Sequence, residues 1–362
     1  MRAIVLVGGE GTRLRPLTYS TPKQLLPVVE VPMLERVLAH LGRHGVDEAI
    51  LSIGYRPDAF AAAYPDGVAA GVRLSYAVEP ELLDTAGAIR FAAAHAGIED
   101  TFIVVNGDVL TDLDVTALVA FHRGHGAEAT INLTAVDDPS RFGVVPTDDR
   151  GRVIAFVEKP PPGEAPTNLI NAGTYVLEPS VLGRIPADRR VSIERETFPA
   201  LAADGALYAS ASESYWLDTG TPAAYLQAHA DLLDGTRPGT PAPGATALAD
   251  RVWALNAPCI EGDVQPSSLV GAAAVVALGA AVRDSVIGAG ALVAPGAAVT
   301  GSVLLPGAHI GEGASVSGSV IGPGAVVGAG CVIEPLTVVG DGVELAPGTK
   351  VADARIPSDT PS

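Results

Sequence analysis

The residues best suited to chemistry lie in one stretch near the N-terminus, residues 3–28 (AIVLVGGEGTRLRPLTYSTPKQLLPV). Its three glycines have no Cβ, so a ligand can approach the backbone N–H groups closely. Arg13 presents a planar fork of donors that suits phosphate, and Lys23 adds a positive charge between two prolines. This combination predicts a loop that binds a triphosphate.

The predicted loop differs from two familiar phosphate-binding motifs. The P-loop pattern G-x-x-x-x-G-K-[ST] is absent, and the dinucleotide pattern G-x-G-x-x-G from Gly9 would need a glycine where Leu14 stands. The loop follows a short apolar run from Ala3 to Val7, which is typical of a buried parallel strand. Ligands of open α/β sheets bind at the carboxyl ends of such strands, so the position of the loop also favours a ligand site.

Asp108 is a second chemical candidate, because it stands where the apolar strand pattern of residues 101–110 (TFIVVNGDVL) ends. Packing explains a carboxylate there poorly, since burying a lone charge is costly. Mg²⁺ prefers carboxylate and phosphate oxygens. We therefore predict that Asp108 is a ligand of a Mg²⁺ cofactor.

The elements that position these residues alternate between strand and helix patterns. We expect strands at residues 48–53, 72–78, 101–110, 127–136 and 169–177, a hairpin at 141–160, and helices at 32–45, 57–64, 114–126, 192–205 and 221–233. Thr221 and Pro222 suit the N-cap and first position of the last helix. This order predicts an α/β fold with a Rossmann-like, doubly wound mixed sheet.

A repeat dominates the last third of the chain. Similar segments begin at residues 268, 285, 302 and 319, seventeen apart, and TVVGDGV follows at 337. Apolar residues recur every six positions within each repeat, which predicts a left-handed parallel β-helix of hexapeptide repeats with one five-residue side per coil. We expect its flat faces to mediate homo-oligomer formation. The predicted organisation is a catalytic domain over residues 1–234, a linker over 235–263, a β-helix domain over 264–355 and a polar tail over 356–362.

Charge and composition restrict the partners. The 362 residues carry a formal net charge of −18, which argues against nucleic acid and anionic membranes as partners. We expect no membrane span and no signal peptide. The two unclustered cysteines fit a reducing cytoplasm. An acidic protein that binds polyphosphate must concentrate its few cations at the site and use Mg²⁺ beside them.

The segments GGEGTRLRPLT and PKQLLPV together resemble the signature of the sugar-1-phosphate nucleotidylyltransferases. The chain is most similar to the bacterial mannose-1-phosphate guanylyltransferases. The resemblance implies a GT-A-like nucleotidyltransferase domain that converts an NTP and a sugar 1-phosphate into an NDP-sugar and pyrophosphate. GTP with mannose 1-phosphate is favoured, and glucose 1-phosphate or a cyclitol phosphate with GTP, UTP, dTTP or ATP is the alternative.

The resemblance also implies roles for individual residues. E-K-P at residues 158–160 and N-A-G at 171–173 resemble the sugar-phosphate motifs, and W-x-D-x-G at 216–220 supplies a second metal ligand. The implied catalytic residues are Arg13, Lys23, Asp108 and Asp218, of which Asp108 and Asp218 bind the metal. The implied nucleotide-binding residues are Leu6, Gly8, Gly9, Gly11, Thr12, Arg13, Glu81, Thr85, Gly87 and Asp108. The implied sugar-phosphate-binding residues are Gly107, Gly143, Glu158, Lys159, Asn171 and Gly173.

Two details of the base and sugar segments stay open in the sequence. Asp84 stands where the family carries glycine in L-G-T-A-G, and since Asp tolerates positive φ we expect the small-residue turn at 85–87 to survive. Glu79 or Glu81 could accept hydrogen bonds from guanine, or both could be solvated loop carboxylates. Glu194 and Glu196 could reach the sugar, or could favour the early turns of their helix, which we prefer for Glu194.

Two other functions compete with this interpretation. A non-catalytic sugar-nucleotide-sensing or scaffolding subunit should have lost the cations and metal carboxylates, which this chain retains. A β-helix that also transfers acyl groups would have to use the single histidine of its repeats, His309.

Overall fold

The computed structural model of the protein describes residues 1–187 and 189–358. The chain forms two compact units. Residues 1–9 and 34–216 form the first unit, and residues 10–33 join the chain from 217 onward in the second. The glycine-rich loop therefore groups with the C-terminal part of the chain, although it follows the first strand directly.

A mixed sheet forms the centre of the first unit. Strands β7, β1, β4 and β6 run parallel in that order, and β12 joins β7 in the antiparallel sense. The strands of this unit up to β8 are β1 (Arg2–Leu6), β4 (Glu48–Ile53), β5 (Val68–Ala69), β6 (Val72–Val78), β7 (Phe102–Asn106) and β8 (Val109–Thr111). The later ones are β9 (Ala129–Ala135), β10 (Gly143–Val144), β11 (Val157–Glu158), β12 (Leu169–Leu177) and β13 (Leu207–Ala211). The predicted mixed α/β sheet is confirmed.

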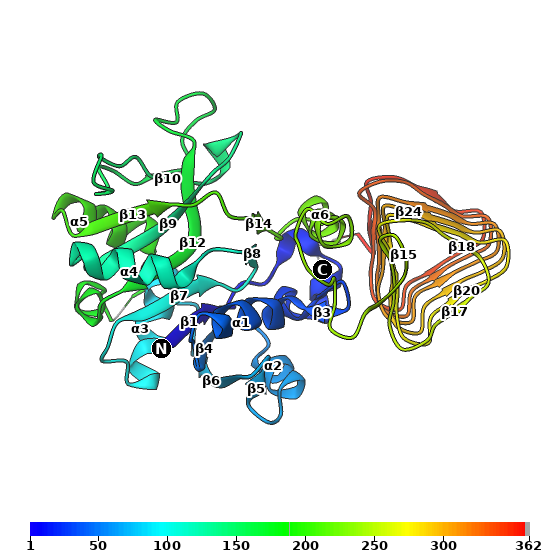
Figure 1. Ribbon diagram of the computed structural model, residues 1–362, viewed down its shortest axis with the longest axis horizontal. Coiled ribbons are helices and arrows are strands. Elements are labelled where there is room, and N and C mark those ends of the chain that lie inside the picture. The colour runs from blue at the N-terminus through cyan, green and yellow to red at the C-terminus, as the bar shows by residue number, and fades with distance from the viewer. Residues whose placement is uncertain (188, 359–362) are drawn as a thin grey trace. The chain divides into compact units, whose positions relative to one another are not determined.

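Helices cover this sheet, as Figure 1 shows for α3 and α4. The helices are α1 (Met33–Arg43), α2 (Pro57–Ala63), α3 (Asp84–Ala96), α4 (Val115–His125) and α5 (Phe198–Ala203). A π-helical turn, Ile193–Thr197, precedes α5 in the segment where the sequence predicts a single helix. The core of the unit combines strand residues such as Ile4 and Val104 with Ile89 of α3, all fully buried.

The second unit contains a parallel β-helix, formed by residues 252–356. Its strands form three sheets, and Figure 1 looks along the stack so that the yellow to red coils superimpose in a three-sided outline. The first sheet contains β16 (Val252–Ala254), β19 (Ser268–Val270), β22 (Val286–Ile287), β25 (Val303–Leu304), β28 (Val320–Ile321), β31 (Val338–Val339) and β34 (Arg355–Ile356). The preceding strand β15 (Thr246–Ala249) joins this sheet by antiparallel pairing with β16.

The other two sheets repeat the same spacing. The second contains β17 (Cys259–Ile260), β20 (Val275–Val276), β23 (Leu292–Val293), β26 (His309–Ile310), β29 (Val326–Val327) and β32 (Glu344–Leu345). The third contains β18 (Asp263–Val264), β21 (Ala281–Arg283), β24 (Ala298–Thr300), β27 (Ser315–Ser317), β30 (Val332–Ile333) and β33 (Lys350–Val351). The predicted β-helix is confirmed.

The β-helix core explains the repeat. Ile287, Val293 and Val299 are fully buried, six residues apart, and Leu304 begins the next coil five residues later. A buried serine begins each of four coils, and the N–H of Ser302 donates to Ser285 Oγ of the preceding coil at 3.0 Å. The serines thus satisfy backbone donors at a tight corner that apolar side chains could not serve.

The coils extend further upstream than the repeat predicts. Val252 pairs with Ser268 and Cys259 with Val275, so strands lie within the segment expected to be a linker. One coil spans eighteen residues and not seventeen, because Val320 pairs with Val338. Leu336 in that coil adopts a φ of 63°. Of the predicted polar tail, residues 359–362 lie outside the described residues.

The remainder of the second unit consists of residues 10–33 and 217–245. The loop at 10–33 contains three 3₁₀ turns and a small hairpin, and β14 and α6 follow later in the chain. These elements are Thr12–Leu14, Leu17–Tyr19, Lys23–Leu25, β2 (Pro27–Val28), β3 (Val31–Pro32), β14 (Trp216–Asp218) and α6 (Pro222–Leu233). Thr221 Oγ1 accepts from Ala224 N at 3.2 Å, which confirms the predicted cap. Across residues 1–187 and 189–358, none of the helices has the length and apolar character that crossing a membrane requires.

Candidate active site

The carboxyl ends of β1 and β7 lie side by side in the first unit. Leu6 pairs with Asn106, and Gly107 N donates to Leu6 O at 3.0 Å. A Cβ on Gly107 would lie 2.9 Å from Val7 Cγ1, so only glycine lets the chain turn this close to β1. Asp108 follows directly, half-buried in the turn between β7 and β8. The fold therefore brings three predicted site residues, Leu6, Gly107 and Asp108, together.

The N-A-G segment lies opposite the end of β7. Thr174 pairs with Val105, and a Cβ on Gly173 would lie 2.6 Å from Asn106 Nδ2. Gly173 has a φ of 76°, which most other residues adopt only with strain. The pairing of β12 with β9 shifts register at this point, which marks a bulge. Bulges redirect side chains at functional sites, and this one directs the N-A-G segment toward Asn106.

The side chain of Asn171 is fixed by its own strand. Its Oδ1 accepts from Gly173 N at 2.9 Å, and its Nδ2 donates to Tyr175 Oη at 2.9 Å. An amide carries two donor hydrogens and two acceptor lone pairs, so Asn171 retains capacity for a ligand while its orientation is held. Burial raises the pKa of Tyr175, so this hydroxyl stays protonated and can donate to a partner.

The E-K-P segment lies on the neighbouring strands. Gly143 pairs with Glu158 across β10 and β11, and Val144 of β10 pairs with a residue of β12. Lys159 has a φ of 50°, its N–H donates to Phe142 O at 3.0 Å, and its Nζ lies 3.3 Å from Glu158 Oε1. The Lys159 side chain is 59% exposed, so a ligand can reach it. The E-K-P and N-A-G segments thus belong to the same sheet, with β10 between β11 and β12.

Two aromatic residues, Phe142 and Trp216, lie beside the E-K-P and N-A-G segments. The sequence motifs identify only Trp216. Trp216 Nε1 donates to Ala172 O at 2.9 Å, and the ring packs edge-on against Phe142 at 5.7 Å between centroids. Trp216 belongs to the predicted W-x-D-x-G motif. Phe142, like Asn106 and Tyr175, was missed, because nothing but its position beside a motif distinguishes it in the sequence.

Of the two carboxylates considered for the base, one is engaged within the protein. Glu79 Oε1 accepts from Ser52 Oγ at 3.1 Å, and Glu79 Oε2 accepts from Leu83 N at 2.9 Å. A Cβ on Gly8 would lie 3.4 Å from Glu79 Oε1, so the glycine-rich turn passes close to this carboxylate. Glu81 is exposed on the following loop. Glu79 therefore organises the turn, and Glu81 remains accessible to a ligand.

The segment after Glu81 differs from the prediction in one respect. Asp84 has a φ of 62°, as its tolerance of positive φ suggested, but α3 begins at Asp84, so residues 85–87 form the first helical turn and not a turn before the helix. Ala86 N and Gly87 N both donate to Val191 O, at 2.9 and 3.2 Å. The Val191 carbonyl thus accepts hydrogen bonds from backbone N–H groups in the first turn of α3. The small residues of this segment do not indicate such a partner in the sequence.

Thr85 and the two glutamates of the later helix have contacts of their own. Thr85 Oγ1 donates to Glu194 Oε2 at 2.7 Å, and Ser192 Oγ donates to the same oxygen at 2.7 Å. Glu194 therefore links the first turn of α3 to the start of the later helix, a structural contact that the preferred role in its own helix did not include. Arg189 Nη2 donates to Glu196 Oε2 at 2.6 Å and holds the pKa of that carboxyl below its usual range.

The glycine-rich loop of the second unit is folded tightly around Lys23. Gly11 has a φ of 65°, and a Cβ there would lie 3.0 Å from Thr18 Cγ2 and 3.2 Å from Lys23 Cβ. Thr18 Oγ1 donates to Gly11 O at 2.9 Å and closes the turn. Gly11 is therefore required by the close approach of Lys23, whereas Gly8 and Gly9 belong to the first unit.

Arg13 and the W-x-D-x-G motif meet within the second unit. Arg13 Nη2 lies 4.0 Å from Asp218 Oδ2, and Gly220 N donates to Asp218 Oδ1 at 2.9 Å. A Cβ on Gly220 would lie 2.6 Å from Arg13 Nη2, so this glycine makes space for the guanidinium. The Arg13 side chain is 56% exposed. Residues 13 and 218, more than two hundred positions apart, thus form one charged cluster, and Thr12 begins the 3₁₀ turn that carries Arg13.

Comparison with protein families agrees with this geometry. The model of the family described as nucleotidyl transferase matches residues 2–235, and that of the GMPPB C-terminal domain matches residues 264–359. The chain belongs to the nucleotidyl transferase family. The resemblance to sugar-1-phosphate nucleotidylyltransferases that the N-terminal motif indicated is thereby confirmed.

Individual mannose-1-phosphate guanylyltransferases resemble the chain over somewhat less than two thirds of its length. The mannose-1-phosphate guanylyltransferase of Mycobacterium tuberculosis is 46% identical over 238 residues, 65% of this chain and 66% of that protein. The mannose-1-phosphate guanyltransferase of Aspergillus fumigatus is 44% identical over 232 residues, 62% of each chain. The matched region thus spans less than two thirds of either relative.

A solved structure shares the fold of the nucleotidyl transferase region. HddC from Yersinia pseudotuberculosis, complexed with GMP-PN, is 30% identical to this chain with a TM-score of 0.54. The match covers 63% of this chain and 97% of HddC.

Nucleotidyl transferases generally use a divalent metal ion, and Asp108 and Asp218 are the two carboxylates predicted to bind it. Asp108 lies in the first unit and Asp218 in the second, and both are half-buried side chains with oxygen donors, which hard cations prefer. Within residues 1–187 and 189–358, His, Cys, Asp and Glu side chains form no group of three or more that could hold a metal. A cation bound by one or two carboxylates takes its other ligands from substrate phosphates and water, as Mg²⁺ does in phosphoryl-transfer sites.

Proposed function

We propose that the protein is a mannose-1-phosphate guanylyltransferase, which converts GTP and mannose 1-phosphate into GDP-mannose and pyrophosphate. The observation that carries this proposal is the placement of the E-K-P and N-A-G segments on β11 and β12 of the sheet whose strand β7 ends at Gly107 and Asp108. Lysine, carboxylate and amide side chains suit a sugar phosphate, which carries both negative charge and hydroxyl groups. The names of the relatives and the GMP-PN bound to HddC support mannose and guanine as the sugar and base.

The chemistry needs no general base, because the phosphate oxygen of the sugar 1-phosphate is already ionised. This oxygen attacks the α-phosphorus of GTP in line, and the bond to the β-phosphate oxygen breaks so that pyrophosphate leaves. Catalysis then consists of positioning and charge stabilisation. Lys159 holds the attacking phosphate, and Arg13 and Lys23 stabilise the charge that grows on pyrophosphate, as cations do in other phosphoryl transfers.

The remaining residues bind the two substrates. Asp108 and Asp218 would hold Mg²⁺, which neutralises phosphate charge when it is bound. Glu158 accepts sugar hydroxyl protons, and the free capacity of Asn171 serves another hydroxyl. The nucleotide lies along Leu6, the glycines of the loop and the first turn of α3 at Thr85 and Gly87, with Glu81 near the base.

The substrate pair is tested by pyrophosphate release in the presence of Mg²⁺, with GTP, ATP, UTP, CTP or dTTP crossed with mannose and glucose 1-phosphates. Release with GTP and mannose 1-phosphate alone is expected. Release with another pair would keep the reaction and overturn the specificity. No release with any pair would overturn the proposed activity and favour a non-catalytic subunit, and omission of Mg²⁺ checks the metal.

Two further properties belong to this proposal. The β-helix, with its flat faces, mediates self-association, which mass photometry of the full chain tests. The protein works in the cytoplasm, where nucleoside triphosphates are available, and its cysteines are compatible with that, because Cys259 and Cys331 are both free. We also place the end of the catalytic domain at residue 234 and the first coil of the β-helix at residue 252, which shortens the predicted linker.

A further inference from the structure

The loop at residues 10–33 carries the cations that the proposed function assigns to the triphosphate, yet it contains little regular structure. Three 3₁₀ turns and the two-residue strands of the β2–β3 hairpin are its only elements. Loops of this kind hold a catalytic geometry only when surrounding residues fix them. The contacts of the loop within the second unit show which residues fix its conformation.

The tip of the hairpin is strained. Val29 has a φ of 47° and Glu30 a φ of 63°, where hairpins with two-residue turns normally carry Asn-Gly or Asp-Gly. A positive φ at a β-branched residue such as Val29 is a true outlier and persists only when the surroundings impose it. Val29 is fully buried. The hairpin therefore depends on partners outside itself for its conformation.

Those partners come from α6 and from the β-helix. Glu30 Oε2 accepts from Ala289 N of the β-helix at 3.1 Å. Val29 N donates to His229 Nδ1 of α6 at 3.2 Å, and Tyr225 Oη of the same helix donates to Pro27 O. His229 and Tyr225 are buried, so both bonds are shielded from water.

Further contacts join the loop to the last coils of the β-helix. Ser20 Oγ donates to Asp341 Oδ2. A Cβ on Gly340 would lie 3.0 Å from Pro16 Cγ, so the backbone of this coil packs against Pro16. In the sequence, Lys23 lies between Ser20 and the hairpin. The chain is therefore anchored both before and after Lys23.

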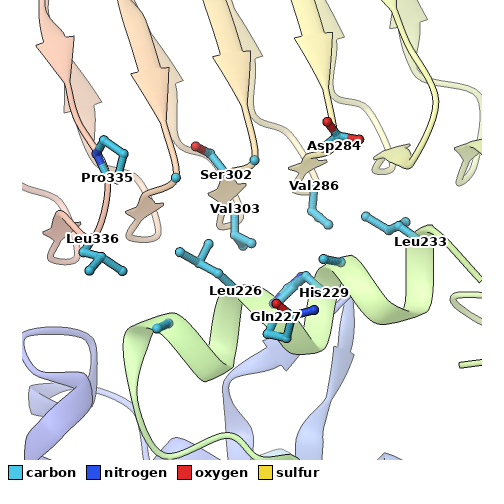
Figure 2. Close-up of a pocket in the computed structure, with 14 residues that line it drawn as sticks. Leu226, Gln227, His229, Leu233, Asp284, Val286, Ser302, Val303, Pro335 and Leu336 are labelled. Atoms are coloured by element: carbon cyan, nitrogen blue, oxygen red, sulfur yellow. The ribbon is translucent and has the colours of Figure 1, made fainter. Parts of the chain in front are cut away.

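Figure 2 shows why the direct contact through Glu30 matters. Leu226, His229 and Leu233 of α6 face Val286 and Val303 of the β-helix across a groove of about 320 Å³. Val286, Val303 and Leu233 are almost fully buried, yet the groove leaves the contact between α6 and the β-helix incompletely filled, so a second contact can add to the support of the hairpin. The hydrogen bond from Ala289 to Glu30 passes directly from the β-helix to the strained turn.

We propose that the β-helix is the support that positions the triphosphate-binding loop, and that Glu30 is a positioning residue for Lys23 and Arg13. The inference rests on the proposed function, which gives those cations their substrate. It assigns to the β-helix a part in catalysis besides self-association. Glu30 itself contacts no substrate in this arrangement and acts through the turn that follows Lys23.

The test uses full-length Glu30→Ala, Glu30→Gln and, as a matched control, Glu312→Ala, which removes an exposed carboxylate of the β-helix elsewhere. Glu30→Ala should raise the KM for GTP and lower kcat by about tenfold or more, because small misplacements of a charged group cost rate steeply. The KM for mannose 1-phosphate should not change. Glu30→Gln should restore the parameters, because its amide oxygen still accepts from Ala289 N, and Glu312→Ala should match the wild type.

Hydrogen exchange separates this inference from the proposed function. Amides of residues 10–33 should exchange faster in Glu30→Ala than in wild type or Glu30→Gln, whether or not the substrates turn over. Unchanged exchange and an unchanged KM for GTP in Glu30→Ala would overturn the inference while the wild-type activity stands. An equal loss in Glu30→Gln would also overturn it, because the hydrogen-bond acceptor is then not what matters. Absence of wild-type turnover would overturn the function alone.

Discussion

The sugar-side segments of the first unit and the phosphate loop of the second are held in different ways. Glu158 and Asn171 lie on strands, and register with β10 and β9, respectively, places them through backbone hydrogen bonds. Residues 10–33 have almost no such ladder. Their long-range contacts come from side chains and coil corners between 186 and 324 positions later in the chain. A regular sheet thus positions one set of candidate residues, and distant tertiary contacts position the other.

The difference predicts separate sensitivities. A backbone ladder distributes its support over many bonds, so one side-chain change on the sugar side affects mainly the group removed. The phosphate loop depends on a few side-chain contacts, so changes far from Lys23 should alter its geometry. Variants in the two regions can confirm or break this distinction.

Loss of Lys23 should have the largest effect. Lys23→Ala is expected to reduce kcat by about 10²–10³-fold, since removing one donor aimed at developing charge has effects of that size. Lys23 is half-buried and lies outside the hydrophobic core, so the melting temperature should fall only slightly. Pyrophosphate release and thermal unfolding measure both quantities.

The chain offers a matched control for this variant, because it has three lysines and Lys350 is exposed on the last coil of the β-helix. Lys350→Ala should keep full activity. Turnover near the wild-type rate in Lys23→Ala would remove this loop from the catalytic machinery, and the contrast between the two regions would lose its functional meaning.

A methyl group at Gly173 should damage the sugar side instead. Gly173→Ala places a Cβ 2.6 Å from Asn106 Nδ2 at a φ of 76°, which should cost about 1–3 kcal/mol of stability. The KM for the sugar 1-phosphate should rise and the KM for GTP should change little. Urea unfolding and steady-state kinetics check the two effects.

Gly124→Ala is the control for this change. Gly124 lies in α4 with nothing within 4 Å of its missing Cβ, so alanine should stabilise the protein by about 0.5–1 kcal/mol. Equal changes in both Michaelis constants for Gly173→Ala would contradict the separation of the two regions.

A smaller effect is expected at the cap of α6, the helix that carries Tyr225 and His229. Thr221→Ala removes the acceptor for Ala224 N and should cost about 1 kcal/mol of stability. Because α6 supports the hairpin, the KM for GTP should rise slightly as well. Thr221→Ser keeps the cap and should restore both values. A loss of stability with an unchanged KM for GTP would show that α6 supports the fold but not the loop.

The elements that the sequence predicted well are those with a pattern among neighbouring residues. The strands at 48–53, 72–78 and 169–177 and the helix at 222–233 match the structure, because alternation and capping are written in neighbouring residues. The coils at 252–264 went unpredicted, since NAPCIEGDV lacks the hexad regularity of later repeats. The motifs located the candidate site residues, whose roles remain predictions.

The sequence could not predict which distant residues form hydrogen bonds with one another. The bond from Ala289 N to Glu30 and the bonds from Ala86 and Gly87 to Val191 O involve backbone groups, which every residue carries and no pattern marks. The assignment of residues 10–33 to the second unit follows from such contacts. Only the folded chain reveals them, because they join positions without any shared periodicity.

The smallest expected effect concerns pH and the Glu30 carboxyl. Burial raises its pKa above the ordinary value, and the Ala289 N–H opposes that shift only in part. A raised native pKa means that the folded state holds this proton more tightly than the unfolded chain does. The resulting stability is therefore present in full below the unfolded pKa and is lost as the pH rises through the native pKa. Glu30→Gln has no proton to lose, so its melting temperature should gain on the wild type as the pH rises above the ordinary Glu pKa of about 4.3 toward neutrality. The control variant Glu312→Gln changes an exposed carboxylate and should show no such dependence of its melting temperature on pH.

A difference in melting temperature between Glu30→Gln and wild type that stays constant with pH would contradict this prediction. It would mean that the Glu30 carboxylate is solvated, and that the turn is held less tightly against the β-helix than its contacts indicate.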